Sequence, residues 1–133
     1  MPNIVENEAI KAATDYLQKQ GYEVENVSKS RKSEHHGYDL IARRAQEEPI
    51  KIEVKGCTRE WGIPDPYETE FDAERRLVAD SLYIVYFLKE EPPRLCIIPR
   101  DAIKPEYVTP KSGWRISSRF KNKKSLEQYL RRP

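Results

Sequence analysis

The hydrophobic positions near the start of the chain follow a helical spacing. Apolar side chains recur three and four residues apart, as on one face of a helix: Ala9, Ile10, Ala13, Tyr16 and Leu17. Asn3 followed by Glu6 is typical of a capping box, and Gly21 is typical of the residue just past a helix end. This stretch predicts a helix from Ile4 to Gln20.

The pattern then changes to the two-residue period of strands. From Ile50 to Lys55, apolar side chains alternate with charged ones, which indicates a half-buried strand, and Gly56 is expected to end it. A polar turn separates this run from a second predicted strand, Tyr38–Arg43. Residues 22–27 predict a further short strand.

In the second half of the chain, a predicted helix is again followed by predicted strands. Thr69 and Asp72 suggest the start of a helix that runs to about Asp80. Two apolar runs then predict strands at Leu82–Leu88 and Arg94–Ile98, and a last strand and short helix are expected at Trp114–Phe120 and Ser125–Leu130. The order predicts an α/β fold in which a mixed β-sheet is flanked by helices.

Length and composition place these elements in one domain. The chain has 133 residues, which suits a single domain over residues 1–133. No apolar run approaches the roughly 18–20 residues that span a membrane. The two cysteines, Cys57 and Cys96, are too few for a disulfide framework, so we expect ordinary thiols in a reducing, cytoplasmic setting.

The small net charge of +2 hides an uneven distribution. Residues 111–133 hold eight basic side chains and one acid, a charge of +7, so residues 1–110 carry −5. A basic end on an acidic body favours a polyanionic partner, although solvated basic tails are common. Candidate contacts to nucleic acid are the basic side chains of this segment and of the polar loop 28–37: Lys29, Arg31, Lys32, His36, Arg115, Arg119 and Lys121.

Acidic residues also gather between positions 68 and 80. The set consists of Glu68, Glu70, Asp72, Glu74 and Asp80. We interpret them as the solvated face of the predicted second helix, with acids near its N-terminus. Among them Glu74 is expected to share the inward face with Phe71 and Val78.

The candidate chemistry lies on the two neighbouring strands. Asp39, in GYDL, precedes Glu53 by fourteen residues, and a short turn joins their strands, so the two carboxylates are expected to lie close together. Side chains two residues apart share a strand face at roughly 7 Å, which puts Lys55 beside Glu53. Glu6 falls on the apolar stripe of the first helix and is a third candidate, because an inward acid needs a partner.

This set suits metal-assisted hydrolysis of a phosphodiester. Two carboxylates hold Mg²⁺ and leave sites for water and phosphate oxygens. The metal polarises the phosphate and acidifies a bound water, and a lysine offsets the charge that develops on phosphorus. The lysine is what distinguishes this set from a simple metal site.

These segments together resemble a known superfamily. Glu6 in VENEAIKAATDYLQ, Asp39 in GYDLIA and Glu53-Val54-Lys55 in IKIEVKG are similar to the motif of the PD-(D/E)xK (restriction-endonuclease-like) nucleases. The amino-acid sequence of these segments is most similar to the domain of unknown function at the C-terminus of NO VEIN proteins. The resemblance covers residues 4–57 by motif and 69–98 by pattern, and it departs from the superfamily where tyrosine replaces proline before the aspartate.

The resemblance implies a role for each motif residue. Asp39 and Glu53 would be ligands of Mg²⁺ or Mn²⁺, with the Val54 carbonyl as a further ligand. Lys55 would be the catalytic lysine, and Glu6 would contact the metal through water or support the site.

The function expected from the sequence is that of a metal-dependent DNA nuclease. We expect DNA in preference to RNA as the substrate, no membrane partner is expected, and double-strand cleavage would favour a homodimer. Two alternatives stay open at this point. One is a catalytically silent, nucleic-acid-binding member of the same fold, and the other is a protein-interaction domain in which the motif residues form only a buried ion-pair network.

Overall fold

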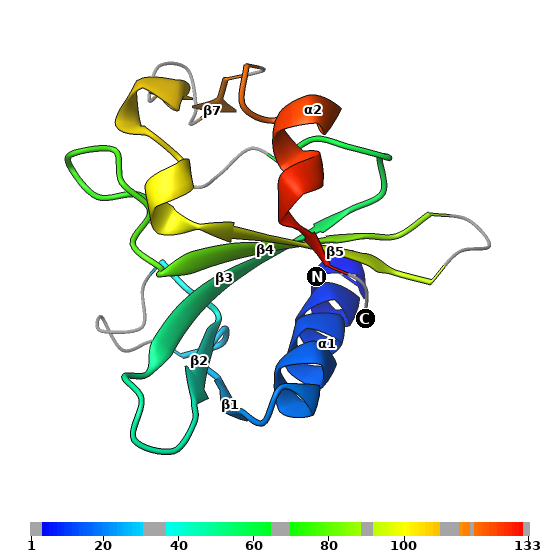
Figure 1. Ribbon diagram of the computed structural model, residues 1–133, viewed down its shortest axis with the longest axis vertical. Helices are drawn as coiled ribbons and strands as arrows, with labels where there is room; N and C mark the ends of the chain where they lie inside the picture. The colour runs from blue at the N-terminus through cyan, green and yellow to red at the C-terminus, as the bar shows by residue number, and fades with distance from the viewer. Residues whose placement is uncertain are drawn as a thin grey trace.

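A six-stranded mixed sheet forms the centre of the molecule. The computed structural model describes residues 4–30, 37–64, 70–88, 92–109, 115–117 and 119–131. The strands are β1 (Glu23–Asn26), β2 (Leu40–Arg43), β3 (Ile50–Cys57), β4 (Ser81–Tyr86), β5 (Arg94–Pro99) and β8 (Leu130–Arg131), in that order across the sheet. Only β3 and β4 pair in parallel, so the sheet is mostly antiparallel (Figure 1).

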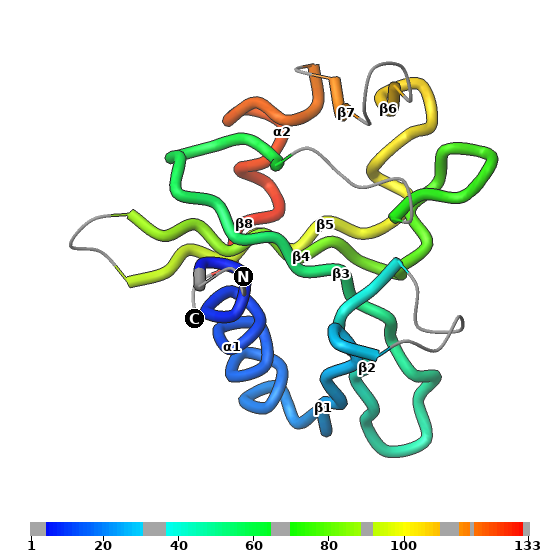
Figure 2. The backbone as a smooth tube through the Cα atoms, turned by 180° about the vertical axis from the view of Figure 1, so that it is seen from behind, coloured from blue at the N-terminus to red at the C-terminus, as the bar shows by residue number. Residues whose placement is uncertain are grey.

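Helical segments cover both faces of this sheet. The helix α1 (Ile4–Lys19) lies on one face. The opposite face carries α2 (Lys123–Leu126), the two-stranded sheet of β6 (Val108–Thr109) and β7 (Arg115–Ile116), and the short 3-10 turns η3 (Arg100–Ala102), η4 (Pro105–Tyr107) and η5 (Glu127–Tyr129) (Figures 1 and 2). The predicted mixed sheet flanked by helices is therefore confirmed. None of the helices in the described ranges is both long and apolar enough to cross a membrane.

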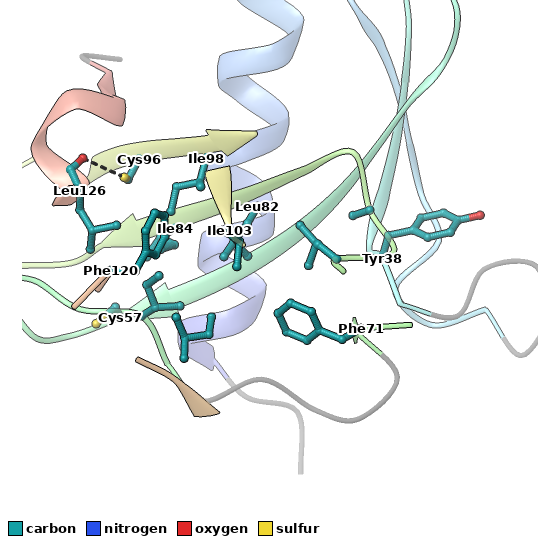
Figure 3. Packing of buried hydrophobic residues seen from close by; sticks show 14 of the residues in the cluster. Tyr38, Cys57, Phe71, Leu82, Ile84, Cys96, Ile98, Ile103, Phe120 and Leu126 are labelled. Atoms are coloured by element: carbon teal, nitrogen blue, oxygen red, sulfur yellow. Dashed lines mark hydrogen bonds between the residues drawn. The ribbon is translucent and has the colours of Figure 1, made fainter. Parts of the chain in front are cut away.

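Because strand side chains alternate between faces, the core divides into two clusters. The cluster beneath α1 contains Ile52 and Val54 of β3 with Ala13 and Leu17 of the helix. The cluster on the other face is larger. In Figure 3, Leu126, Phe120 and Cys57 lie at one end of it, and Phe71 and Tyr38 lie at the other.

The first helix follows its predicted pattern closely. It begins at Ile4 and ends at Lys19, one residue before the expected end. Gly21 has a φ of 90°, the left-handed conformation that glycine adopts most readily after a helix, and its N–H donates to the Gln18 carbonyl at 3.0 Å. The proposed cap, Asn3, lies outside the described residues.

The prediction that Gly56 ends its strand is wrong. The strand β3 runs through Gly56 to Cys57. A Cβ atom at Gly56 would lie 2.7 Å from Val5 Cγ1 and 2.9 Å from the Val5 carbonyl oxygen. The glycine therefore lets α1 pack closely on the strand, a reason that local sequence does not show.

The predicted helix from Thr69 to Asp80 is also wrong in the part that the structure describes. Residues 70–80 form a tight reversal in which Phe71 and Leu77 make an antiparallel bridge. The Asp72 side chain accepts hydrogen bonds from the N–H groups of Glu74 and Arg76, both at 2.9 Å, and Arg75 has a φ of 63°. Aspartate offers the backbone these local bonds in place of helical ones.

The C-terminal elements are shorter than predicted. The strand expected at Trp114–Phe120 is reduced to the two residues of β7, and Trp114 lies outside the described residues. The closing helix is present as α2 followed by η5, and the chain then adds the edge strand β8 to the sheet. The predicted strands at Leu82–Leu88 and Arg94–Ile98 are confirmed as β4 and β5.

Candidate functional site

The site begins where β2 stops pairing with β3. The last register pair is Leu40 with Ile52, and the Asp39 N–H donates to the Ile52 carbonyl at 2.8 Å. One step further on, the Val54 N–H donates to Asp39 Oδ2 at 2.8 Å. The Asp39 carboxylate thus accepts the hydrogen bond that a carbonyl of β2 would otherwise accept, and this bond fixes its position beside β3.

The Val54 carbonyl is oriented by the same geometry. In a strand, the N–H and C=O of one residue point to the same side. The Val54 carbonyl therefore points to the side where β2 has ended and Asp39 lies.

Glu53 completes a pair of carboxyl groups with Asp39. It is buried, with 5% of its surface exposed, and its side chain is hydrogen-bonded to that of Asp39. Burial raises the pKa of Glu53 well above its usual range, and the charges of Asp39 and Glu70 add to the rise. Burial also raises the pKa of Asp39, against the opposing effect of the Val54 N–H.

Lys55 lies on the same face of β3 as Glu53. Glu53 is in register with Leu82 and Lys55 with Ile84, and both of these neighbours belong to the core cluster opposite α1. Lys55 Nζ donates to Glu70 Oε2 at 2.6 Å, and the two residues are only 6% and 4% exposed. Burial by itself would lower the pKa of Lys55, but the charge and hydrogen bond of Glu70 outweigh it and raise the pKa.

Glu6 approaches this group from the helix. It lies half-buried in the first turn of α1, and its charge contributes to the raised pKa of Lys55. The structure therefore brings Asp39, Glu53 and Lys55 together as predicted, and Glu6 is near enough for its charge to act on Lys55. Their catalytic roles stay predictions.

Glu70 is the site residue that sequence reasoning missed. Its assignment to a solvated helix face is wrong, because the residue is buried and paired with Lys55. Glu74, which was expected to face inward, is exposed, and Glu68 lies outside the described residues. The one available signal was indirect: a lysine buried on a strand requires a counter-charge, and the local sequence does not say which acid supplies it.

The donor set at this site fits a divalent cation in its chemistry, although the described residues do not form a complete ligand shell. Within the described residues, no group of three or more His, Cys, Asp or Glu side chains is arranged to hold a metal ion. The pair of Asp39 and Glu53 nevertheless has suitable chemistry, since a buried carboxyl that adjoins a half-buried one needs a proton or a cation between them. Their oxygens, with the Val54 carbonyl nearby, are the hard ligands that Mg²⁺ and Mn²⁺ accept.

The predicted nucleic-acid contacts are spread over the molecule. Lys29, Arg115 and Arg119 are exposed, and Lys121 is half-buried. Arg119 lies above the Tyr107 ring at 5.7 Å from its centre. Arg31, Lys32 and His36 lie outside the described residues. Lys29 follows β1, which lies at the opposite edge of the sheet from β8, so Lys29 is distant from the C-terminal edge strand.

Fold and site together define a small α/β domain that holds a carboxylate–lysine cluster on a central strand. The family described as Protein NO VEIN, C-terminal, matches residues 5–98, which is more than half of the chain and includes α1 and β1 to β4. The chain belongs to this family. No curated protein matches the chain.

Proposed function

We propose that this domain is a metal-dependent nuclease that hydrolyses phosphodiester bonds in DNA, with a restriction-endonuclease-like core. The observation that carries the proposal is the pair formed by half-buried Asp39, just before β2, and buried Glu53 of β3, with Lys55 on the same strand face as Glu53. The helix α1, the antiparallel strands β1 to β3 and the parallel strand β4 support the fold assignment.

Each residue has a defined task in this proposal. Asp39 and Glu53 would hold Mg²⁺ or Mn²⁺, and the Val54 carbonyl is oriented to join them. The bound cation would polarise the phosphate and acidify a water. Lys55 would neutralise charge on the phosphate oxygens, and Glu70 keeps its ammonium group charged and in place.

The decisive experiment measures nicking of supercoiled plasmid and cleavage of labelled single-stranded and branched DNA, with Mg²⁺, Mn²⁺ or EDTA. We expect cleavage with metal only, and its loss in Asp39→Asn, which keeps an oxygen to accept the Val54 N–H. Lys51→Gln is the matched control, since this lysine of β3 is exposed. Cleavage that survives in Asp39→Asn would contradict the proposal.

Lys55 needs a substitution that preserves the fold. Lys55→Met alone leaves Glu70 buried without its cation, so loss of activity would be ambiguous. The double variant Lys55→Met/Glu70→Leu removes both charges, and it should stay folded while losing cleavage.

Sedimentation of the parent protein tests the homodimer expected for double-strand cutting.

A second candidate is a silent member of the same fold that binds nucleic acid without cutting it. The Lys55–Glu70 pair favours this reading, because a lysine enclosed and bound to an acid is held away from a substrate phosphate. Salt-sensitive DNA binding with no cleavage under any metal would support this candidate over the nuclease.

A further inference from the structure

A second group of functional side chains surrounds Trp61, in the segment that follows β3. The Arg94 guanidinium lies over the indole at 5.5 Å from its centre, and the Lys123 ammonium at 5.8 Å. The Tyr86 ring packs against the indole with its centre 6.0 Å away. Arg94 begins β5 and Lys123 begins α2, so three distant segments meet at this tryptophan.

A third cation belongs to the same place. A Cβ atom at Gly62, the residue after Trp61, would lie 3.6 Å from a terminal nitrogen of the Arg59 guanidinium, which places this cation beside the tryptophan segment. Burial raises the pKa of the Tyr86 hydroxyl, and the charges of Arg59 and Arg94 both oppose that rise. Arg59 and Lys123 are exposed, and neither forms an ion pair with an acid among the described residues. We call Arg59, Trp61, Arg94 and Lys123 the Trp61 cluster.

The indole is fixed in place but is not fully covered. Trp61 is half-buried and packs against the core cluster opposite α1. Its Nε1 is enclosed and donates to no acceptor in the described part of the chain. Beneath it, the Tyr86 hydroxyl donates to the Gly62 carbonyl at 2.5 Å, which ties the loop to β4.

The Trp61 cluster lies next to the proposed active site. Cys57 is two residues beyond Lys55 on the same strand face, roughly 7 Å along β3. The Cys57 thiol donates to the Arg59 carbonyl at 3.7 Å, so the cluster starts directly after this position. The Trp61 cluster therefore follows the proposed active site directly along the chain.

We propose that the Trp61 cluster is a subsite for an unpaired nucleotide, in which the indole stacks on a base and the surrounding cations bind the adjoining phosphates. Stacking requires a base that is free of its duplex neighbours, so the subsite selects a single-stranded segment. Lys123 is exposed and lies over the ring in the free protein. When a nucleotide binds, the base takes this position on the ring, and the Lys123 side chain moves aside to contact a phosphate. The role of this subsite in cleavage rests on the proposed function, but nucleotide binding at the Trp61 cluster does not.

Trp61 fluorescence provides a direct test. The chain has two tryptophans, so Trp114→Phe leaves Trp61 as the single reporter. Titration of this protein with an oligothymidylate in EDTA and low salt should quench the emission. Trp61→Leu, followed by anisotropy of a labelled oligonucleotide, should weaken binding by about 5- to 150-fold.

Charge variants extend the test without disturbing the core. Lys123→Gln and Arg59→Gln should each weaken binding several-fold, and each should lower the slope of log K against log salt by about 0.7. Lys19→Gln, in the last turn of α1 on the other face of the sheet, is the matched control and should change neither quantity beyond the error.

The outcomes separate this inference from the nuclease proposal. Quenching and weakened binding in the variants, with no cleavage by the parent protein, would uphold the subsite and reject the nuclease. Cleavage that Trp61→Leu leaves unchanged, together with unquenched emission, would overturn the subsite. Equal binding of a duplex, or competition by polyglutamate at the same charge concentration, would also overturn it and indicate a general polyanion surface.

Discussion

The two faces of β3 bury side chains of opposite character. On the side of α1, Ile52 and Val54 are fully buried among apolar side chains, and Gly56 lets the helix approach. On the other side, Glu53 and Lys55 are almost as deeply buried, yet both are charged or titratable. The first face is purely apolar packing, whereas the second encloses ionisable groups.

The difference shows how burial of charge is made tolerable. Transfer of an isolated ion into the interior costs several kcal/mol, and a partner must offset that cost. Lys55 has Glu70 as its partner, while the adjoining carboxyl groups of Glu53 and Asp39 need either a shared proton, which forms a hydrogen bond between them, or a bound cation in its place. The polar face is therefore stable only as a complete set, and changes to single members should be costly.

The largest expected effect comes from removing one member of the buried pair. Lys55→Met leaves Glu70 uncompensated and should lower the free energy of unfolding by about 3–5 kcal/mol. The double variant Lys55→Met/Glu70→Leu should recover most of this loss. Urea unfolding of the single and double variants measures both, and additive effects would show that the pair is not coupled.

On the apolar face, Gly56 is a position that leaves no room for a larger side chain. Its replacement by alanine places a methyl group within 3 Å of Val5, so Gly56→Ala should cost about 1–3 kcal/mol by overpacking. Val5→Ala in the same chain should relieve the clash with the Val5 side chain but not the clash with its carbonyl oxygen. Thermal unfolding checks both variants, and an unchanged Tm for Gly56→Ala would show that the helix shifts freely.

The carboxyl pair of Asp39 and Glu53 should make the free energy of unfolding depend on pH. Because its pKa is raised in the folded state, Glu53 stabilises the protein below its unfolded pKa, and this contribution is lost as pH rises through the folded pKa. In EDTA, the stability of the parent relative to Glu53→Gln should fall with pH by up to about 1.4 kcal/mol per unit. Urea unfolding at several pH values measures it, and a constant difference would contradict the shared proton.

The smallest effect is expected for an ion pair on the surface. Arg43 and Glu25 are about half exposed and lie 2.9 Å apart across β1 and β2. Arg43→Gln should cost less than about 1 kcal/mol, because water and salt screen the pair. The contrast with Lys55→Met, measured in the same urea series, sharpens the comparison between exposed and buried charge.

Local pattern was sufficient for the regular elements. The spacing of Ala9, Ala13 and Leu17 predicted α1, and the alternation around Ile52 predicted β3, because each element buries one face at its own period. Local pattern failed for residues 70–80, where Thr69 and Asp72 suggested the start of a helix and the Asp72 side chain instead supports a turn. It failed again at Gly56, whose role depends on a helix more than thirty residues away in the chain.

For the site, the sequence by itself determined three of the interacting groups, Asp39, Glu53 and Lys55, because their strands are adjacent and the two-residue period fixes which side chains share a face. Only the tertiary structure decided that Glu70 binds Lys55 and that Arg94 and Lys123 meet at Trp61. These contacts join segments whose separation is set by the packing of loops and strands. No local periodicity encodes such a distance, so the partner of a buried charge emerges only when the chain has folded.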